Sequence, residues 1–313
     1  MEKIGMKKAK DITIKEGYEE FIRRCKVNNY SPYTIKYYNN NMNIFGLFCD
    51  LDSPITVINE DLINQYVLYL QEQKIKDYTV SSYMKALRAV LYFFMQKDYI
   101  DEFKVTVPKA DKELKSIYTD VELAILLKKP NLKKCSFVEY RTWVMVNYLI
   151  ATGQRLKNLQ YLKIADLDFE NRVVKLNHTK NRKQTLLPLS NSIIEVLSEY
   201  LKYRKGKPDD YVFCKTNGEQ LGKTGIEQAI VRYSHKRGID KTSVHLYRHT
   251  FAKKYLLNGG DLARLQRLLC HSDISTTKEY LNLIIDDLQQ DFDSLNPHES
   301  FYRNNKKIKM KNK

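Results

Sequence analysis

The sequence predicts a mainly α-helical protein of two domains, with one small β-hairpin in the second domain. Three observations predict this fold class. The chain has 313 residues, which is longer than most single domains. Apolar residues recur at steps of three and four along most of it. This pattern stops between Glu102 and Tyr118, where charged residues and Pro108 cluster, so we expect two compact units joined by a linker.

Four helices are expected in the first hundred residues. An amphipathic stretch near Ile12–Lys26 predicts the first. Ser31-Pro32 opens the second, because serine caps helix N-termini and proline is preorganised for the first turn. The third starts near Asn59, and Thr79 or Ser81 precedes the fourth. The apolar side chains expected in the core of this bundle are Ile14, Phe21, Ile22, Tyr38, Met42, Phe45, Leu62, Ile63, Val67, Leu70, Tyr83, Leu87, Leu91 and Phe94.

The second domain is expected to combine helices with one hairpin. Arg172–Leu189 has apolar, partly β-branched residues on both sides of a polar turn, which predicts a β-hairpin with a basic tip. The predicted helices lie near Thr119–Lys129, Ser136–Ala151, Ser190–Lys205 and Thr224–Arg237. We place the helical N-terminal domain at residues 1–107, the linker at 108–117, the second domain at 118–295 and a disordered basic tail at 296–313.

The charge balance favours a polyanionic partner. The chain has 53 Lys and Arg against 37 Asp and Glu, a formal charge of +16. Residues 1–107 carry 15 basic and 14 acidic side chains, residues 108–295 carry 32 and 22, and residues 296–313 carry 6 and 1. The positive excess therefore lies in the second half and the tail. This asymmetry is typical of a nucleic-acid binder, although a solvated surface with spare lysines has the same composition.

Several classes of protein are disfavoured. No apolar run approaches the roughly 20 residues of a membrane-spanning helix. The lysine-rich start does not resemble a secretory signal, so we expect a cytoplasmic protein with no membrane partner. The five cysteines form no CxxC pair, which fits neither a zinc site nor a disulfide scaffold, and reduced thiols are expected.

The strongest chemical signal is HLYRH at His245–His249, followed by a segment that ends in Tyr280. Residues three apart return to nearly the same helix face, so His245 and Arg248 can point together and grip a phosphate, with Ser243 as the N-cap. His249 is expected to be structural. Asn258-Gly259-Gly260 ends this helix, Asp261 caps the next, and Ser275 or Thr276 caps a third whose first turns carry Tyr280.

This pattern resembles a known family. The HxxR motif followed by LLCHSDISTTKEY is similar to the signature of the tyrosine recombinases, the phage integrase family. ATGQRLKNLQYL resembles the family's first arginine motif, and HTKNRKQTLLPL resembles its β-hairpin. YSPYTIKYY and TVSSYMKALRAVLYFF resemble its core-binding domain. The resemblance covers roughly residues 12–290, and it implies a two-domain DNA clamp that cuts and rejoins DNA at specific sites.

The resemblance assigns a role to six residues and requires no metal or cofactor. Tyr280 is the nucleophile that forms a 3′-phosphotyrosyl link, and Lys180 delivers a proton to the leaving 5′-oxygen. The remaining catalytic residues, which bind the phosphate or assist proton transfer, are Arg155, His245, Arg248 and His271. Two positions depart from the family pattern: Asn158 replaces an acidic residue that could support Arg155, and Cys270 replaces a glycine.

The implied partner is double-stranded DNA carrying core sites, on which four protomers form a homo-tetramer. The candidate DNA contacts on the N-terminal helices are Arg23, Arg24, Lys85 and Arg88, although exposed basic side chains on helices are commonly just solvated. A catalytically silent DNA-binding regulator would predict damage at Tyr280, Arg155 or Arg248, and a type IB topoisomerase would lack the core-binding motifs. Transposition, excision and chromosome resolution stay open, as do the accessory proteins.

Overall fold

A computed structural model describes residues 12–110, 116–177, 184–281, 296–299 and 301. The chain divides into two compact units, one formed by residues before 114 and the other by the residues from 114 onward. Each unit has its own hydrophobic core. Most of the predicted tail at 296–313 lies outside the described residues, and so does part of the predicted linker at 108–117.

The described part of the N-terminal unit contains four α-helices, as the sequence predicts. They are α1 (Ile14–Val27), α2 (Pro32–Gly46), α3 (Glu60–Glu72) and α4 (Asp77–Gln96), with a 3₁₀ turn, η1 (Ile55–Val57), between α2 and α3. The side chains of Ser31 and Asn59 accept hydrogen bonds from backbone N–H groups in the first turns of α2 and α3, which confirms both predicted starts. The predicted start of the fourth helix is wrong. It begins earlier, at Asp77, whose negative charge in the first turn suits the helix dipole.

The core of this unit forms around α4, which packs against the other three helices. The predicted core side chains are buried or half-buried in it, and the Phe45 and Tyr66 rings meet edge-on with centroids 5.0 Å apart.

The segment after α4 is only partly a linker. Val105 lies within the break in the apolar pattern that begins at Glu102, yet it is 4% exposed and packs against this core.

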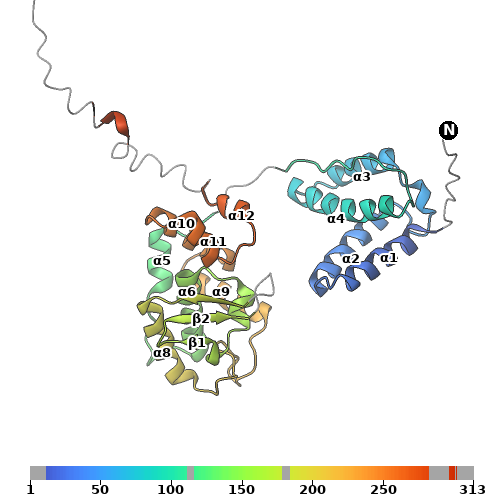
Figure 1. Cartoon of the computed structure of the whole chain (residues 1–313). Helices are drawn as coiled ribbons and strands as arrows, with labels where there is room; N and C mark the ends of the chain where they lie inside the picture. The colour runs from blue at the N-terminus through green and yellow to red at the C-terminus, as the bar shows by residue number, and fades with distance from the viewer. Residues whose placement is uncertain (1–11, 111–115, 178–183, 282–295, 300, 302–313) are drawn as a thin grey trace, which may run out of the picture. The chain divides into compact units, whose positions relative to one another are not determined.

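The C-terminal unit is built around α6 (Phe137–Thr152), whose side chains are buried on nearly every side. It packs against α5 (Asp120–Leu127), α8 (Asn191–Arg204), α9 (Lys223–His235) and α10 (Val244–Leu257). These elements confirm the helices predicted in this half. Three shorter helices complete the described part: α7 (Leu156–Gln160), α11 (Leu262–Leu268) and α12 (Ile274–Lys278). Figure 1 shows α10, α11 and α12 together at one end of the unit.

A three-stranded antiparallel sheet covers one side of the unit (Figure 1). Its order is β1 (Leu167–Asp168), β2 (Val173–Leu176) and β3 (Thr185–Pro188), and Val174 lies opposite Leu187. The β2–β3 pair confirms the predicted hairpin strands. The turn between them, residues 178–183, lies outside the described residues. β1 follows a 3₁₀ turn, η2 (Ile164–Asp166), and has only two residues, too few for an alternating pattern to predict it.

Candidate active site

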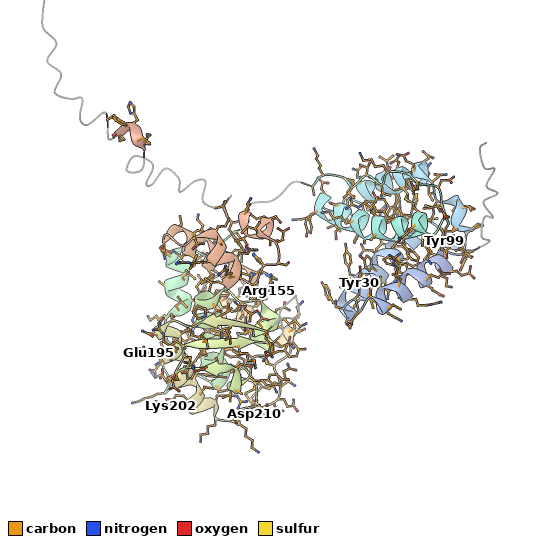
Figure 2. All side chains as sticks on the ribbon, viewed as in Figure 1. Tyr30, Tyr99, Arg155, Glu195, Lys202 and Asp210 are labelled. Atoms are coloured by element: carbon orange, nitrogen blue, oxygen red, sulfur yellow. The ribbon has the colours of Figure 1, made fainter. Side chains whose placement is uncertain are left out.

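Three segments of the C-terminal unit bring together five of the six predicted catalytic residues: the chain just after α6, the first turns of α10, and the segment from α11 to just beyond α12. Gly153 ends α6 in the left-handed conformation, with φ of 61°. A side chain at this position would also collide with the ring of Phe251 on α10. Glycine therefore lets the two helices approach and turns the chain toward Arg155. Figure 2 labels Arg155 between the upper helices and the sheet, at the opposite end of the unit from Lys202 and Asp210.

Arg248 is buried and is held by three contacts. It is 4% exposed. Its Nη1 donates to the carbonyl of Gly153 at 2.7 Å, and its Nη2 donates to the carbonyl of Leu269 at 2.7 Å. Nη2 also lies 2.7 Å from Nε2 of His271. These contacts fix the plane of the guanidinium, and since this group carries five N–H donors, donor capacity remains for a phosphate oxygen.

Arg155 lies near Arg248 and donates hydrogen bonds to the same stretch of backbone. Its Nη1 donates to the carbonyls of Leu269 and Cys270 at 3.3 and 3.4 Å. The Leu269 carbonyl thus accepts from both arginines. The backbone at Leu269 and Cys270 is therefore the element that gathers the two cations into one site.

The guanidiniums of Arg155 and Arg248 form a cation pair without a carboxylate partner among the described residues. Burial, followed by the charge of Arg155, lowers the pKa of Arg248 to about 10. Burial also lowers the pKa of Arg155. Both groups remain charged at neutral pH. Within the described residues no Asp or Glu forms an ion pair with either. Two desolvated like charges of this kind favour a bound anion.

The hydrogen bonds of His271 define its protonation state. Arginine can only donate, so Nε2 of His271 accepts from Arg248. Nδ1 therefore carries the hydrogen and donates to Oγ1 of Thr277, 2.7 Å away. In this arrangement His271 is a neutral imidazole that orients Arg248.

Tyr280 lies against the arginine and histidine cluster. It is 3% exposed, and its ring packs on Ala252, Leu265 and Leu269. The ring is parallel to that of His271, with centroids 6.2 Å apart and an interplanar angle of 4°. The predicted cap of the last helix is wrong, because Asp273 caps α12 by accepting from the backbone N–H of Ser275. As a result Tyr280 follows the helix end instead of lying within its first turns.

His245 joins the site from the first turn of α10. The backbone N–H of His245 donates to Oγ of Ser243 at 3.3 Å, which confirms the predicted cap. The His245 side chain is solvent-accessible. The surrounding protein nevertheless desolvates the ring partly, and together with the charges of Arg248 and Arg155 this lowers its pKa. His245 is therefore predominantly neutral at pH 7.

The two departures from the family pattern lie close to the arginines. Asn158 is buried and donates to Oε1 of Gln154 at 2.8 Å, and Gln154 donates to the carbonyl of Leu268 at 2.9 Å. Asn158 thus links α7 to α11 through Gln154. Cys270 adopts φ of 51°, a left-handed conformation that favours glycine. Burial raises the pKa of its thiol, although Arg155 and Arg248 oppose this shift.

One contact was not anticipated from the sequence. Nδ1 of His249 lies 3.2 Å from Oη of Tyr280, and the two rings are 5.5 Å apart. The sequence contained one signal: His249 follows His245 by four residues, which places both on one helix face. Lys180, by contrast, lies outside the described residues, and β2 and β3 flank the range that contains it.

The four candidate DNA contacts lie on α1 and α4 of the N-terminal unit. Arg23 and Lys85 are exposed, and Arg88 is half-buried. Arg24 donates to Oε1 of Gln96 at 2.6 Å and lies over the ring of Phe93 at 5.4 Å. Arg24 is therefore partly engaged within its own unit.

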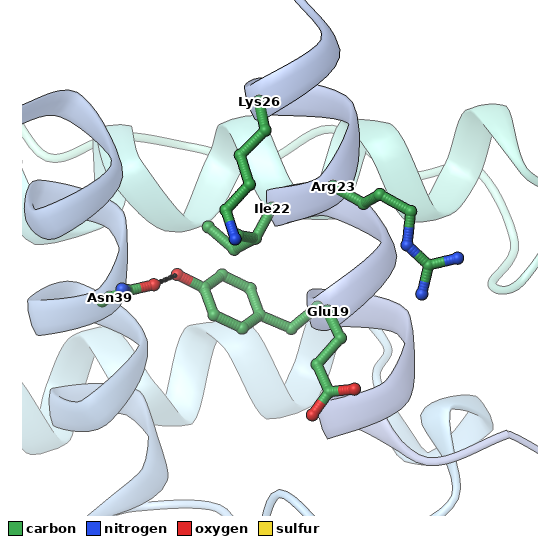
Figure 3. A pocket seen from close by; sticks show the side chains of 6 residues that line it. Glu19, Ile22, Arg23, Lys26 and Asn39 are labelled. Carbon is green, nitrogen blue, oxygen red and sulfur yellow. Dashed lines mark hydrogen bonds between the residues drawn. The ribbon is translucent and has the colours of Figure 1, made fainter. Parts of the chain in front are cut away.

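Arg23 also lines a shallow pocket of about 300 Å³ between α1 and α2, together with Tyr18, Glu19, Ile22, Lys26 and Asn39. In Figure 3 Arg23 extends away from the hydrogen bond of 2.8 Å between Tyr18 and Asn39. This leaves its guanidinium at the surface.

Three further findings concern the described residues alone. No group of three or more His, Cys, Asp or Glu side chains that could hold a metal ion gathers among them. None of the helices found there has the length and apolar character needed to cross a membrane. All five cysteines fall within these ranges, and none is bonded to another.

Comparison with known proteins matches both units. Residues 118–284 match the phage integrase family, and residues 18–101 match the N-terminal SAM-like domain of phage integrases. Tyrosine recombinase XerD of Staphylococcus saprophyticus is 28% identical over 296 residues, covering 91% of this chain and 99% of that protein. The crystal structure of XerA recombinase matches with a TM-score of 0.52 and 25% identity, over 90% of this chain and 98% of that chain. The Tn1549 transposon integrase, solved in complex with circular intermediate DNA, matches with a TM-score of 0.70 and 22% identity, over 86% of this chain and 95% of that chain. The chain therefore belongs to the phage integrase family of tyrosine recombinases.

Proposed function

We propose that this recombinase cleaves and rejoins double-stranded DNA core sites through a covalent bond between Tyr280 and the 3′-phosphate. The observation that carries the proposal is the uncompensated pair of guanidiniums of Arg155 and Arg248 beside the phenol of Tyr280. Their shared backbone acceptor at Leu269 holds two cations where one phosphodiester could bind both. A phosphate would then supply the negative charge that the described residues do not.

The charges of the site suit the chemistry of phosphoryl transfer. Negative charge on the nonbridging oxygens grows as Oη of Tyr280 attacks phosphorus, and fixed cations stabilise that charge most. Arg155 and Arg248 provide this stabilisation through directional hydrogen bonds, so the proposed reaction requires no metal or cofactor. His271 keeps Arg248 oriented, and neutral His245 is suited to hydrogen-bond a phosphate oxygen. We assign Lys180 as the acid that protonates the leaving 5′-oxygen, on the resemblance of its hairpin motif.

We assign DNA binding to residues 1–107 and catalysis to residues 118–295, joined by a linker at 108–117. Arg23, Lys85 and Arg88 are then the phosphate contacts of the N-terminal domain, with Arg24 a weaker candidate because Gln96 and Phe93 already engage it. The complex of the Tn1549 integrase with circular intermediate DNA supports a DNA substrate. The family resemblance supports a homo-tetramer on two core sites. Transposition, excision and chromosome resolution all fit, and a DNA substrate favours action in the cytoplasm.

The test uses duplexes built from the DNA that flanks the gene, with single nicks placed at successive positions across each inverted repeat. A nick just beyond the cleavage point lets the cut fragment diffuse away, so the covalent complex accumulates; we call this duplex the suicide substrate. Wild-type protein should form an SDS-resistant adduct. Tyr280→Phe should bind the same DNA with unchanged affinity and form no adduct, because only the nucleophilic oxygen is lost. An adduct with Tyr280→Phe would refute the assignment of the nucleophile.

A further inference from the structure

We propose that His249 accepts the proton of Tyr280 when the phenol attacks DNA, acting as the general base of cleavage. This inference rests on the proposed role of Tyr280 as the nucleophile. The carrying observation is the distance of 3.2 Å between Nδ1 of His249 and Oη of Tyr280. This is a hydrogen-bond distance to the atom that reacts, so the proton can transfer directly along an existing contact.

The burial of Tyr280 creates the need for such an acceptor. The side chain is 3% exposed and packs on Ala252, Leu265 and Leu269. Bulk water therefore has little access to the phenol. A protonated phenol is a weak nucleophile, so its proton must leave as the oxygen–phosphorus bond forms. In this setting a neighbouring side chain is better placed than solvent to take it.

His271, the other histidine against the Tyr280 ring, is not suited to this role. Its Nε2 accepts from Arg248, and its Nδ1 carries a hydrogen that is donated to Thr277. Nε2 is thus committed to Arg248 and Nδ1 to Thr277. The ring lies parallel to that of Tyr280, with an interplanar angle of 4°.

His249 lies on α10, the helix that also carries Arg248. His245, Arg248 and His249 lie at successive positions of one face of α10, and the His245 and His249 rings stack with centroids 6.5 Å apart. Attachment to a rigid helix limits the motion of Nδ1 relative to Arg248. Arg248 and His249 can therefore reach the phosphate and the phenol from one helix, which is an arrangement that preorganised catalysis favours.

The atoms of the step balance as follows. His249 begins neutral, with its hydrogen on Nε2 and a lone pair on Nδ1. The bond between Oη and phosphorus forms while the bond from phosphorus to the 5′-oxygen breaks. The phenol proton passes to Nδ1, which gives an imidazolium, and the 5′-oxygen takes a proton from Lys180, which becomes a neutral amine. Rejoining reverses both transfers, and no oxidant or reductant takes part.

The experiment varies the base and the acidity of the phenol together. His249→Ala removes the acceptor. His249→Asn keeps a polar atom near the place of Nδ1 but cannot take up a proton. Each is combined with tyrosine or with 3,5-difluorotyrosine at position 280, introduced by amber suppression, because the fluorinated phenol ionises more readily and needs a base less. His235→Asn, on an exposed histidine of α9, is the matched control. Adduct formation on the suicide substrate is timed at saturating DNA, and DNA affinity and melting temperature are measured for every variant.

The proposal predicts that His249→Ala and His249→Asn both slow adduct formation by on the order of 10² to 10⁴-fold with tyrosine at 280. Difluorotyrosine should restore most of that rate in both variants, while His235→Asn keeps the wild-type rate. A wild-type rate in His249→Asn, or slow variants that difluorotyrosine fails to rescue, would overturn the assignment and leave His249 a packing residue. If His249→Ala does not fold, the proposal is tested by His249→Asn alone, compared with tyrosine and with difluorotyrosine at position 280. A negative result with the His249 variants does not change the outcome expected for Tyr280→Phe. Failure of the general-base proposal is therefore distinguishable from failure of the proposed function.

Discussion

Arginines in the two units of this recombinase are held in different ways. In the N-terminal unit Arg24 is exposed, bonds to a single glutamine side chain and lies over Phe93. In the C-terminal unit Arg248 is buried and is held by two backbone carbonyls and His271. An exposed cation loses little solvation free energy on folding, whereas burying a cation without a carboxylate partner costs much more. The contrast fits the roles proposed above, in which exposed cations of the first unit contact DNA phosphates and the second unit positions the groups that react.

The largest effect is expected at Lys180. Lys180→Ala should slow cleavage of a normal phosphodiester by on the order of 10² to 10⁴-fold, because the leaving 5′-oxygen loses its proton donor. A substrate with a bridging 5′-phosphorothiolate should restore the rate, since sulfur leaves without a proton. The measurement is the rate of adduct formation on the two substrates.

The control for this rescue is Arg248→Ala, which should remain slow on both substrates because its defect is in charge stabilisation. If sulfur rescues both variants equally, or neither, Lys180 is not the specific acid. Lys183 and His245 would then be the next candidates. DNA affinity should be nearly the same in both variants, as expected for a defect confined to the chemical step.

A somewhat smaller effect is expected from Arg248→Lys. The ammonium group keeps the charge but cannot contact the carbonyls of Gly153 and Leu269 and also His271 in one plane. We expect adduct formation to slow by about 10² to 10³-fold, the loss typical of one misplaced transition-state donor. Single-turnover rates at saturating DNA measure it. A lysine variant with near wild-type rate would show that charge alone suffices and that the buried geometry is not needed.

In the N-terminal unit the expected effect is on affinity. Lys85→Gln and Arg88→Gln should each lower the slope of log K against log salt by about 0.9 on duplex DNA if each side chain neutralises one phosphate. The rate of adduct formation at saturating DNA should not change. Fluorescence anisotropy across a salt series measures the slope. An unchanged slope would show that these side chains are only solvated, and a slower rate at saturation would break the division of roles between the units.

The smallest effect is expected at Cys270. A non-glycine residue in the left-handed conformation costs roughly 1 to 2 kcal/mol, and glycine in the unfolded chain gives back about 0.5 to 1 kcal/mol of this as entropy. Cys270→Gly should therefore stabilise the protein by up to about 1.5 kcal/mol, a rise in melting temperature of up to about 6 °C. Calorimetry of the full chain measures this rise. A lower melting temperature would mean that packing of the thiol outweighs the backbone strain at φ of 51°.

The sequence predicted most of the helices because their starts carry side chains that cap the backbone, as at Ser31, Asn59 and Ser243. It failed at two helix starts. Asp273 caps α12 in place of Ser275 or Thr276, and α4 begins at Asp77 without a side-chain cap. Local preference can rank such neighbours only weakly, since packing of the whole helix decides among them.

The site was predictable in its residue types but not in its contacts. Motif spacing identified Arg155, Arg248, His271 and Tyr280, and the structure brings these four together. A sequence motif cannot identify the backbone carbonyls that bind the arginines, because every residue has a backbone carbonyl. The contact from His249 to Tyr280 joins residues 31 positions apart, and the folding of α10 against the last loop creates it.

The central claim is that one particular tyrosine becomes covalently bound to DNA. The direct measurement is to trap the adduct of the wild-type protein on the suicide substrate, digest it with trypsin and nuclease, and locate the nucleotide by mass spectrometry. The account predicts the nucleotide on Tyr280, in the peptide that begins at Glu279 after cleavage at Lys278. A nucleotide on any other of the 23 tyrosines, or on a serine, would contradict it.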